Sequence, residues 1–274
     1  MKLNSTTFCL FAFAIFAASF NLSAEGKKSA DKNLTNSERA KEILDKARKS
    51  KISTVSTKVT RTSKETIENI CWRKFNPDGT ILTKLQVTWR NSKGKITYKS
   101  TRIVKSDGTA WQIIGDIAIK SEESKPPINF SKKTSKPKYK LSEINYKSIP
   151  CYKITIINDT ASLNDNPIAL EVFTIGKDNL FIYSTNYYTK DGNLLVSIAY
   201  ESIKKMEGVG EEFFNIPSNC RIYIAKTGAE YAKLNALAGD KLRIQLGSDN
   251  GMKKYYEKKY GTSDIDEIIK MTTE

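Results

Sequence analysis

The first regular spacing of apolar and polar positions predicts an amphipathic helix near the start of the chain. Thr35 and Glu38 have the spacing of a capping box, in which side chain and backbone satisfy each other's free amides at a helix start. Charged residues alternate with an apolar stripe at helical spacing, made of Ala40, Ile43, Leu44 and Ala47. We expect a helix over 36–49, too short to be stable alone, that docks its stripe on another element.

After this helix the period of the pattern changes from helical to alternating. The clearest strand starts at Ile81, and its alternation predicts one buried face and one wet face. The buried face is predicted to carry Ile81, Leu85, Val87 and Trp89, and the wet face Lys84, Gln86, Thr88 and Arg90.

Turn residues separate further strands of this kind. Asn, Asp and Gly tolerate the positive φ of tight hairpins, and they recur at 76–79, 91–94, 106–108 and 190–193. Long loops are expected at 120–140 and 159–167, where proline, lysine or asparagine interrupt the pattern. The strands predict an antiparallel meander, and we expect a single curled sheet of about nine or ten strands without an internal domain boundary.

The pattern becomes helical again after Gly228. A short helix is expected over 229–237, a turn-rich segment over 239–251, and a last helix near Ser263 that buries Ile265, Ile268 and Ile269. This part is interpreted as a helical appendage that packs against the sheet.

The first 24 residues have the composition of a secretion signal. Lys2 is followed by an apolar run from Phe8 to Phe20 and by small residues up to Ala24. The run is shorter than the ~20 apolar residues that span a bilayer, although an uncleaved anchor is the alternative interpretation. We expect cleavage near Ala24, a flexible polar leader over 25–34, and a soluble periplasmic or secreted protein.

Charge and composition narrow the function. The chain has 45 Lys and Arg against 30 Asp and Glu, a net charge of +15, and no histidine. Without histidine, His-dependent catalytic pairs and the usual zinc or iron ligand sets are excluded. No phosphate-binding glycine motif occurs, so we expect neither an enzyme nor a cofactor. The basic surface favours an anionic partner such as a lipid headgroup or an acidic protein, or it serves solubility alone.

Three cysteines follow the predicted signal: Cys71, Cys151 and Cys220. Export permits a disulfide, but an odd number allows at most one internal bridge. Three unpaired cysteines packed as small apolar groups are the alternative.

The end of the second meander carries a family resemblance. Residues 187–203 give a strand, an Asp-Gly turn and a strand, and Glu212-Phe-Phe-Asn-Ile-Pro217 follows soon after. This combination resembles the outer-membrane lipoprotein-sorting (LolA-like) superfamily over about Thr35 to Ile224. The resemblance implies an α+β, mainly β fold with an unclosed half-barrel sheet over 35–226, covered by helix and loops, and a helical extension over 227–274. It also implies a cleft that accepts acyl chains of lipoproteins or lipids.

The apolar strand positions are the candidate binding residues. These residues either line a cleft or fill a core. The pattern does not separate the two, because the wall of a cleft and the wall of a core are equally apolar. The candidates are Val87, Trp89, Tyr98, Trp111, Ile154, Phe173, Tyr183 and Ile198. Our leading hypothesis is a periplasmic carrier or sensor of an apolar, lipid-like ligand, with a lipid, a lipoprotein acyl chain or a membrane-associated protein as partner and no nucleic acid. The alternative is a non-catalytic module that binds an anionic protein or envelope polymer.

Overall fold

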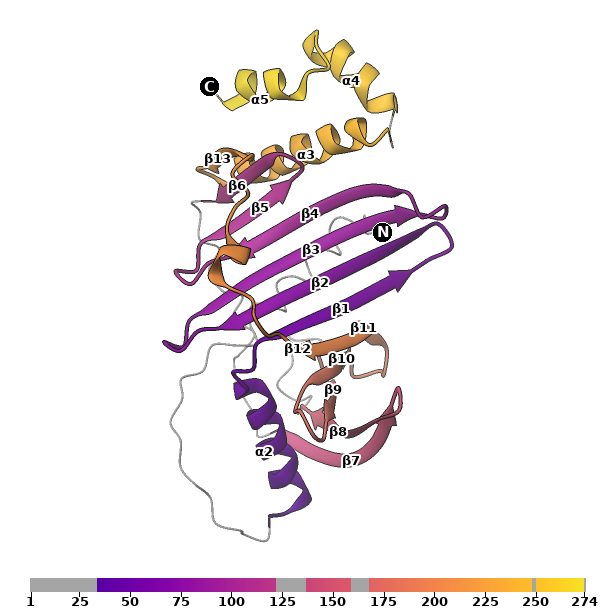
Figure 1. The fold of residues 1–274 in the computed structure, drawn as a ribbon. Coiled ribbons are helices and arrows are strands. Elements are labelled where there is room, and N and C mark those ends of the chain that lie inside the picture. The colour runs from indigo at the N-terminus through magenta and orange to yellow at the C-terminus, as the bar shows by residue number, and fades with distance from the viewer. Residues whose placement is uncertain (1–33, 122–136, 159–167, 248–249, 274) are drawn as a thin grey trace. The chain divides into compact units, whose positions relative to one another are not determined.

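The structure is a computed structural model that describes residues 34–121, 137–158, 168–247 and 250–273 (Figure 1). The predicted signal and nearly all of the predicted leader lie outside these residues. The chain divides into two compact units whose segments alternate along the sequence. One takes its described residues from Met1–Lys51 and Pro126–Tyr200, and the other from Ile52–Lys125 and Glu201–Glu274. We call them unit 1 and unit 2.

Unit 1 combines one helix with a five-stranded antiparallel sheet. Helix α2 (Asn36–Lys49) begins at the predicted capping box. The Glu38 amide donates to the Thr35 side chain, and the Thr35 amide donates to the Glu38 side chain. The sheet has the order β11-β10-β9-β8-β7. Its strands are β7 (Lys138–Tyr146), β8 (Ile149–Ile157), β9 (Leu170–Gly176), β10 (Ile182–Tyr188) and β11 (Leu194–Ala199).

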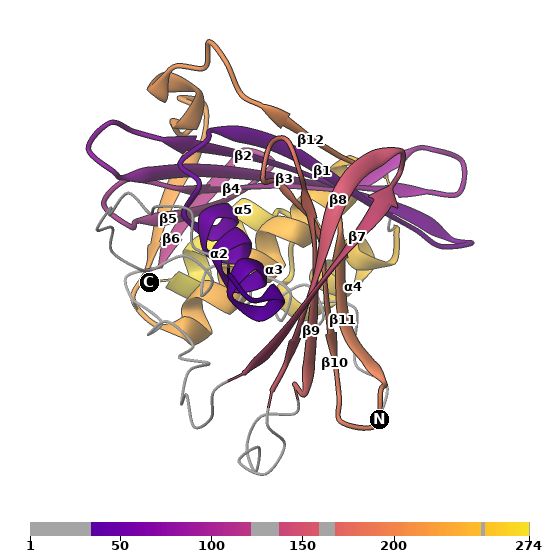
Figure 2. The same ribbon diagram turned by 90° about the horizontal axis from the view of Figure 1, so that it is seen from below.

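Helix α2 covers one face of β7–β9 (Figure 2). Its buried residues Ala40, Leu44 and Ala47 are those of the predicted stripe, and they pack on a small core of sheet residues: Ile154, Ile156, Phe173 and Ile175. Burying this apolar stripe gives the short helix the tertiary support that it lacks alone.

Unit 2 is built on an eight-stranded sheet with the order β12-β1-β2-β3-β4-β5-β6-β13. Hairpins connect β1 to β6, and all pairs are antiparallel except β6 with β13, which is parallel. Its strands are β1 (Thr54–Arg61), β2 (Glu65–Phe75), β3 (Ile81–Asn91), β4 (Ile96–Val104), β5 (Ala110–Ile114), β6 (Ile117–Ser121), β12 (Ser202–Lys205) and β13 (Arg221–Ala225).

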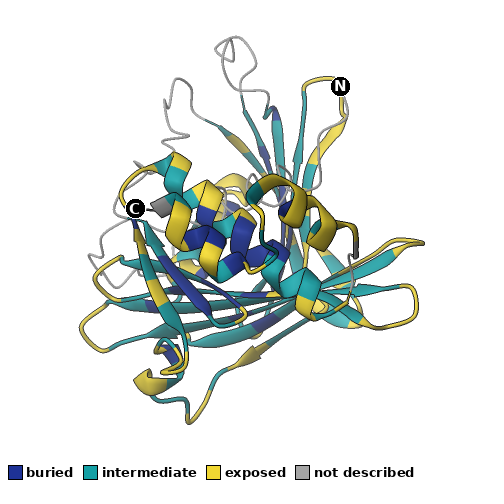
Figure 3. Cartoon of the chain, turned by 90° about the horizontal axis from the view of Figure 1, so that it is seen from above, coloured by how far each residue is buried: buried dark blue, intermediate teal, exposed yellow. Residues whose placement is uncertain are grey.

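The two faces of this sheet have different covers. Helix α3 (Gly228–Gln245) covers one face over β4, β5 and β6, where Ile114, Ile117 and Ile119 are buried. Helices α4 (Asn250–Tyr260) and α5 (Ile265–Thr273) pack against α3. The chain around the 3₁₀ helix η2 (Glu211–Phe214) covers the other face, where Phe214 packs with Leu82 and Ile103. We call these the helix face and the η2 face. Figure 3 shows buried positions within the strands and helices and exposed ones at the hairpin turns.

The predicted fold class is confirmed, because the described chain is mainly β with open antiparallel sheets and covering helices. The expectation of a single sheet is wrong. The predicted strand over 194–203 is in fact β11 and β12, which belong to different sheets. The exchange takes place between adjacent residues, since the Tyr200 amide donates to the Tyr183 carbonyl and the Glu201 amide to the Thr57 carbonyl.

Two further expectations are wrong. In both, the residues concerned are covered by segments that are distant in the sequence. The predicted wet face of β3 is the η2 face, and Leu82 and Thr88 on it are only 4% and 3% exposed. The predicted turn-rich segment after Gly239 is helical up to Gln245, because the buried side of α3 continues past that glycine.

The last helix and the loops follow the sequence expectations more closely. Ile265, Ile268 and Ile269 are buried as predicted, at 3%, 0% and 0% exposure. Strand β6 extends to Ser121 and β7 begins at Lys138, so the ends of the predicted 120–140 loop are strand. The middle of that loop and the predicted 159–167 loop lie outside the described residues.

Candidate binding site

Trp89 and Tyr98 form an aromatic pair on the helix face of unit 2. The register of β2, β3 and β4 places Ile67, Trp89 and Tyr98 side by side in one row. The rings of Trp89 and Tyr98 meet edge to face with 5.9 Å between centroids and 68° between planes. The register between β3 and β4 shifts directly after Trp89, so the regular ladder is interrupted beside this pair.

The pair belongs to a larger apolar strip on the same face. The strip comprises Ile67, Leu85, Val87, Trp89 and Tyr98, all half-buried. Ile67, Leu85, Val87 and Trp89 belong to none of the three hydrophobic clusters that form the cores of the described chain. The strip therefore holds apolar surface that those cores do not use.

Tyr98 marks the limit of the helical cover. It packs against the cluster beneath the C-terminal helices, and the Arg243 guanidinium lies 5.6 Å from its ring centroid. A Cβ at Gly239 would lie 3.6 Å from Tyr98 Cε2, an ordinary contact distance, so α3 approaches the ring closely at this point. The strip begins where α3 ends its cover of the sheet.

The indole of Trp89 carries an unmet hydrogen-bonding group. Its Nε1 is buried and has no hydrogen-bond partner among the residues that the structure describes. Leaving such a donor unsatisfied costs about 1–3 kcal/mol, so an acceptor on a bound molecule would gain from meeting it.

Trp111 lies on the η2 face and not beside Trp89. The register aligns it with Ile103 and, through Ile103, with Lys84. It packs against the cluster around Phe214. The sequence placed both tryptophans on apolar strand faces, but the register shows that these faces are opposite.

The other four candidates belong to unit 1. Ile154, Phe173 and Ile198 share one row across the sheet, in which Ile154 and Phe173 form the core beneath α2. The Arg48 guanidinium lies 5.0 Å from the Phe173 ring centroid, and Ile198 is half-buried on β11. Tyr183 lies at a register shift of β10, where it contacts the Tyr146 ring at 6.2 Å and its hydroxyl accepts from Asn179.

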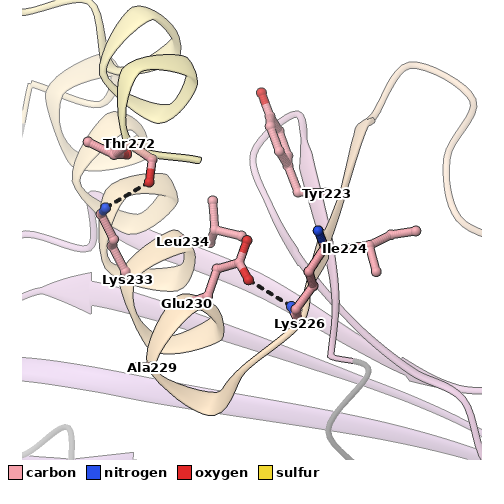
Figure 4. A pocket seen from close by; sticks show the side chains of 8 residues that line it. All are labelled: Tyr223, Ile224, Lys226, Ala229, Glu230, Lys233, Leu234 and Thr272. Atoms are coloured by element: carbon pink, nitrogen blue, oxygen red, sulfur yellow. Dashed lines mark hydrogen bonds between the residues drawn. The ribbon is translucent and has the colours of Figure 1, made fainter. Parts of the chain in front are cut away.

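A hollow that the sequence reasoning missed lies between β13, α3 and α5 (Figure 4). Its volume is about 610 Å³, and Tyr223, Leu234 and Thr272 are among its lining residues. The Lys226 amide donates to Glu230 Oε2 at 2.7 Å, and Lys233 Nζ donates to the Thr272 carbonyl at 3.0 Å. The alternation Ile222-Tyr223-Ile224 was the available signal for β13.

A cluster of four charged groups secures α5 near the sheet edge. Lys241 Nζ lies 2.9 Å from Oδ1 of both Asp116 and Asp266, and Arg221 contacts both carboxylates at 2.6 and 2.8 Å. Burial acts to raise the pKa of each carboxyl, but the bonds from Lys241 and Arg221 outweigh it and hold the pKa below its ordinary value. Because every charge is paired within the cluster, we interpret it as structural.

Two features, a metal-binding group and a membrane-spanning helix, are absent from the described residues. They hold no group of three or more acidic or cysteine side chains placed to bind a metal ion. None of their helices combines the length and apolar character needed to cross a bilayer. The described cysteines, Cys71, Cys151 and Cys220, are all unpaired, which favours the second of the two alternatives left open by the sequence.

Comparison with known proteins gives matches at the level of structure. No family model matches the chain, and no curated protein matches it by sequence. An uncharacterized conserved protein from Thermus thermophilus matches with a TM-score of 0.45 and 14% identity, covering 68% of this chain and 99% of that one. MucB in the Pseudomonas aeruginosa MucA/MucB complex matches with a TM-score of 0.45 and 14% identity, covering 69% of this chain and 64% of that one.

A LolA superfamily protein from Nitrosomonas europaea matches with a TM-score of 0.30 and 12% identity, covering 67% of this chain and 99% of that one. These matches concern the fold and not a ligand.

Proposed function

We propose that the protein is a non-catalytic binding protein, a carrier or sensor that acts in the periplasm and holds an apolar, lipid-like ligand against the strip on the helix face of unit 2. The observation that carries the proposal is the strip itself. It is a set of half-buried apolar side chains, of which all but Tyr98 lie outside the cores of the described chain.

The chemistry of the strip suits an acyl chain with a polar end. Each CH₂ group that it buries contributes about 0.8 kcal/mol, so a partly inserted chain already binds well. The Trp89 indole donor finds no partner in the described part of the chain, and an ester or carboxylate oxygen of the ligand would accept from it. A lipid or a lipoprotein acyl chain combines both features.

The proposal selects among the sequence candidates. Val87, Trp89 and Tyr98 lie on the strip and are assigned to ligand binding. Ile154, Phe173 and Trp111 pack in cores, which supports a structural role for them. Ile198 and Tyr183 are not assigned to this site.

The test uses a dansyl-labelled fatty acid as the probe. We expect it to bind the wild-type protein and to quench tryptophan fluorescence by energy transfer. Val87→Asp should weaken probe binding by about tenfold or more, because a carboxylate would be placed in the apolar strip. Trp89→Phe should remove most of the energy transfer while thermal melting shows the fold intact.

Trp111→Phe is the matched control, since Trp111 lies on the opposite face of the same sheet. It should leave probe affinity unchanged. Native mass spectrometry of protein isolated from membranes without harsh detergent should also show a co-purifying lipid. A protein that is empty in that experiment and does not bind the probe would refute the proposal.

A further inference from the structure

Strand β13 is an edge strand with unused backbone groups. Among the described residues it pairs only with β6. The Arg221 amide donates to the Asp116 carbonyl at 2.8 Å, so the backbone N–H of Arg221 points toward β6. Because backbone groups alternate along a strand, the N–H and C=O of Ile222 and Ile224 point away from β6 and toward the free edge.

The side chains on this edge are unusually apolar for an exposed strand. Ile222 and Ile224 are 58% and 48% exposed, among the most exposed large apolar residues of the described chain. Natural edge strands usually carry charges or proline that prevent pairing with another chain. An edge that keeps two exposed isoleucines has the form of a site for strand addition.

The hollow beside this edge provides a second element of recognition. Figure 4 shows β13 on one side of it and the first turns of α3 on the other. Tyr223 and Leu234 supply apolar surface, while Lys226 and Lys233 are exposed at its margin. A strand added to the edge would place alternate side chains against the isoleucines and into this hollow.

Charge decides between two occupants of the edge. Pairing of β13 with β13 of a second copy would bring the lysines of both copies together, in a chain whose net charge is already +15. An acidic segment would instead pair with Lys226. The Arg221 charge is already neutralised by Asp116 and Asp266, and among the residues that line the hollow the two lysines outnumber the one carboxylate, Glu230.

From these observations we propose that β13 binds an extended partner peptide with alternating apolar and acidic residues, which adds a strand to the edge of the eight-stranded sheet. Backbone bonds to Ile222 and Ile224 supply affinity, and the hollow and the lysines supply selectivity. This site is separate from the apolar strip, because β5 and β6 lie between β13 and the strands β2, β3 and β4 that carry the strip.

The test measures fluorescence anisotropy of a short labelled peptide of alternating valine and aspartate. We expect wild-type protein to bind it in the micromolar range and not to bind the corresponding valine–lysine peptide. Ile224→Pro removes an outward N–H without touching the ladder to β6, so it should weaken binding by about tenfold or more. Ile224→Val keeps that N–H and should retain most of the affinity.

A charge variant gives a second measurement that does not alter the strand. Lys226→Glu should weaken binding of the acidic peptide, and the loss should grow as the salt concentration falls. Lys258→Glu, which changes another exposed lysine, on α4, should not weaken it. Absence of binding by the valine–aspartate peptide overturns the proposal. Binding unaffected by Ile224→Pro and Lys226→Glu overturns it too, as does a wild-type dimer that Ile224→Pro abolishes.

Discussion

The hydroxyl of Tyr256 donates to Oδ2 of Asp240 at 2.6 Å, with both residues buried, at 6% and 7% exposure. This bond ties α4 to α3. The other carboxylate oxygen accepts from Arg243 at 3.1 Å. Burial, with the Asp240 carboxylate as a further cause, raises the pKa of Tyr256 well above its ordinary value, so the phenol keeps its proton and remains a donor.

Tyr256→Phe should therefore destabilise the protein by about 1–3 kcal/mol, because it leaves a buried carboxylate oxygen without its donor. Urea denaturation followed by circular dichroism measures the change. Tyr255→Phe is the control: Tyr255 is 52% exposed, and its hydroxyl accepts from the exposed Lys259. A loss of equal size in both variants would show that the buried bond contributes nothing specific.

The charged cluster at α5 predicts a pH-dependent contribution to stability. The pKa of Asp266 is lowered in the folded protein, so its contribution is complete above the unfolded-state pKa of about 4 and is lost as the pH falls through the lower folded value. Asp266→Asn lacks this contribution. The difference in unfolding free energy between wild type and variant should be constant above about pH 5 and should shrink below about pH 4.

The measurement is urea denaturation of both proteins across that pH range, and the comparison cancels the titration of carboxyls outside the charged cluster. Glu267→Gln, a neighbouring change on the same helix, should show no such difference. A wild-type advantage over Asp266→Asn that persisted undiminished at acid pH would contradict the assigned ion pairs.

Phe214 is expected to be a major anchor of unit 2. Its side chain is 0% exposed and packs with Leu82 and Ile103 on the η2 face. Phe214→Ala should cost about 3–5 kcal/mol through lost burial and the cavity left behind. Leu194→Ala, at a 55% exposed position, should change the unfolding free energy by well under that amount. Equal effects of the two substitutions would exclude Phe214 as an anchor.

The cysteines should differ in their reaction with a thiol reagent. Burial raises the pKa of Cys71 to about 11, and Cys151 is 0% exposed, so both should be protected in the native protein. Cys220 is half-buried and should be labelled first. Alkylation with iodoacetamide, mapped by mass spectrometry before and after unfolding, gives the order. A disulfide found between any two of them would contradict the structure.

Local features of the sequence predicted local structure well. The Thr35 and Glu38 pair fixes the start of α2, and hairpin turns such as Asp107-Gly108 fix the ends of strands, because both depend on neighbouring residues only. The apolar stripe of α2 likewise identified the face that is buried.

Features that depend on distant segments were not predictable in this way. The alternation of β3 showed two faces, but nothing near Lys84 in the sequence indicates that Phe213, far along the chain, accepts a hydrogen bond from it at 2.9 Å. Trp89 and Trp111 each looked like a cleft residue, and only the register across β4 places them on opposite faces. The grouping of strands into two sheets depends on a change of partner at Tyr200 and Glu201 that leaves no composition signal.

The interleaving of the two units has a consequence for biogenesis. The meander β1–β6 receives its outer strands, β12 and β13, only after the whole second segment of unit 1 has been synthesised. A ribosome or a secretion channel releases the chain from its N-terminus, so the earlier half emerges with both sheet margins unprotected. Assistance by a holdase during synthesis, and failure of fragments that stop before Arg221 to fold, are therefore expected of this architecture.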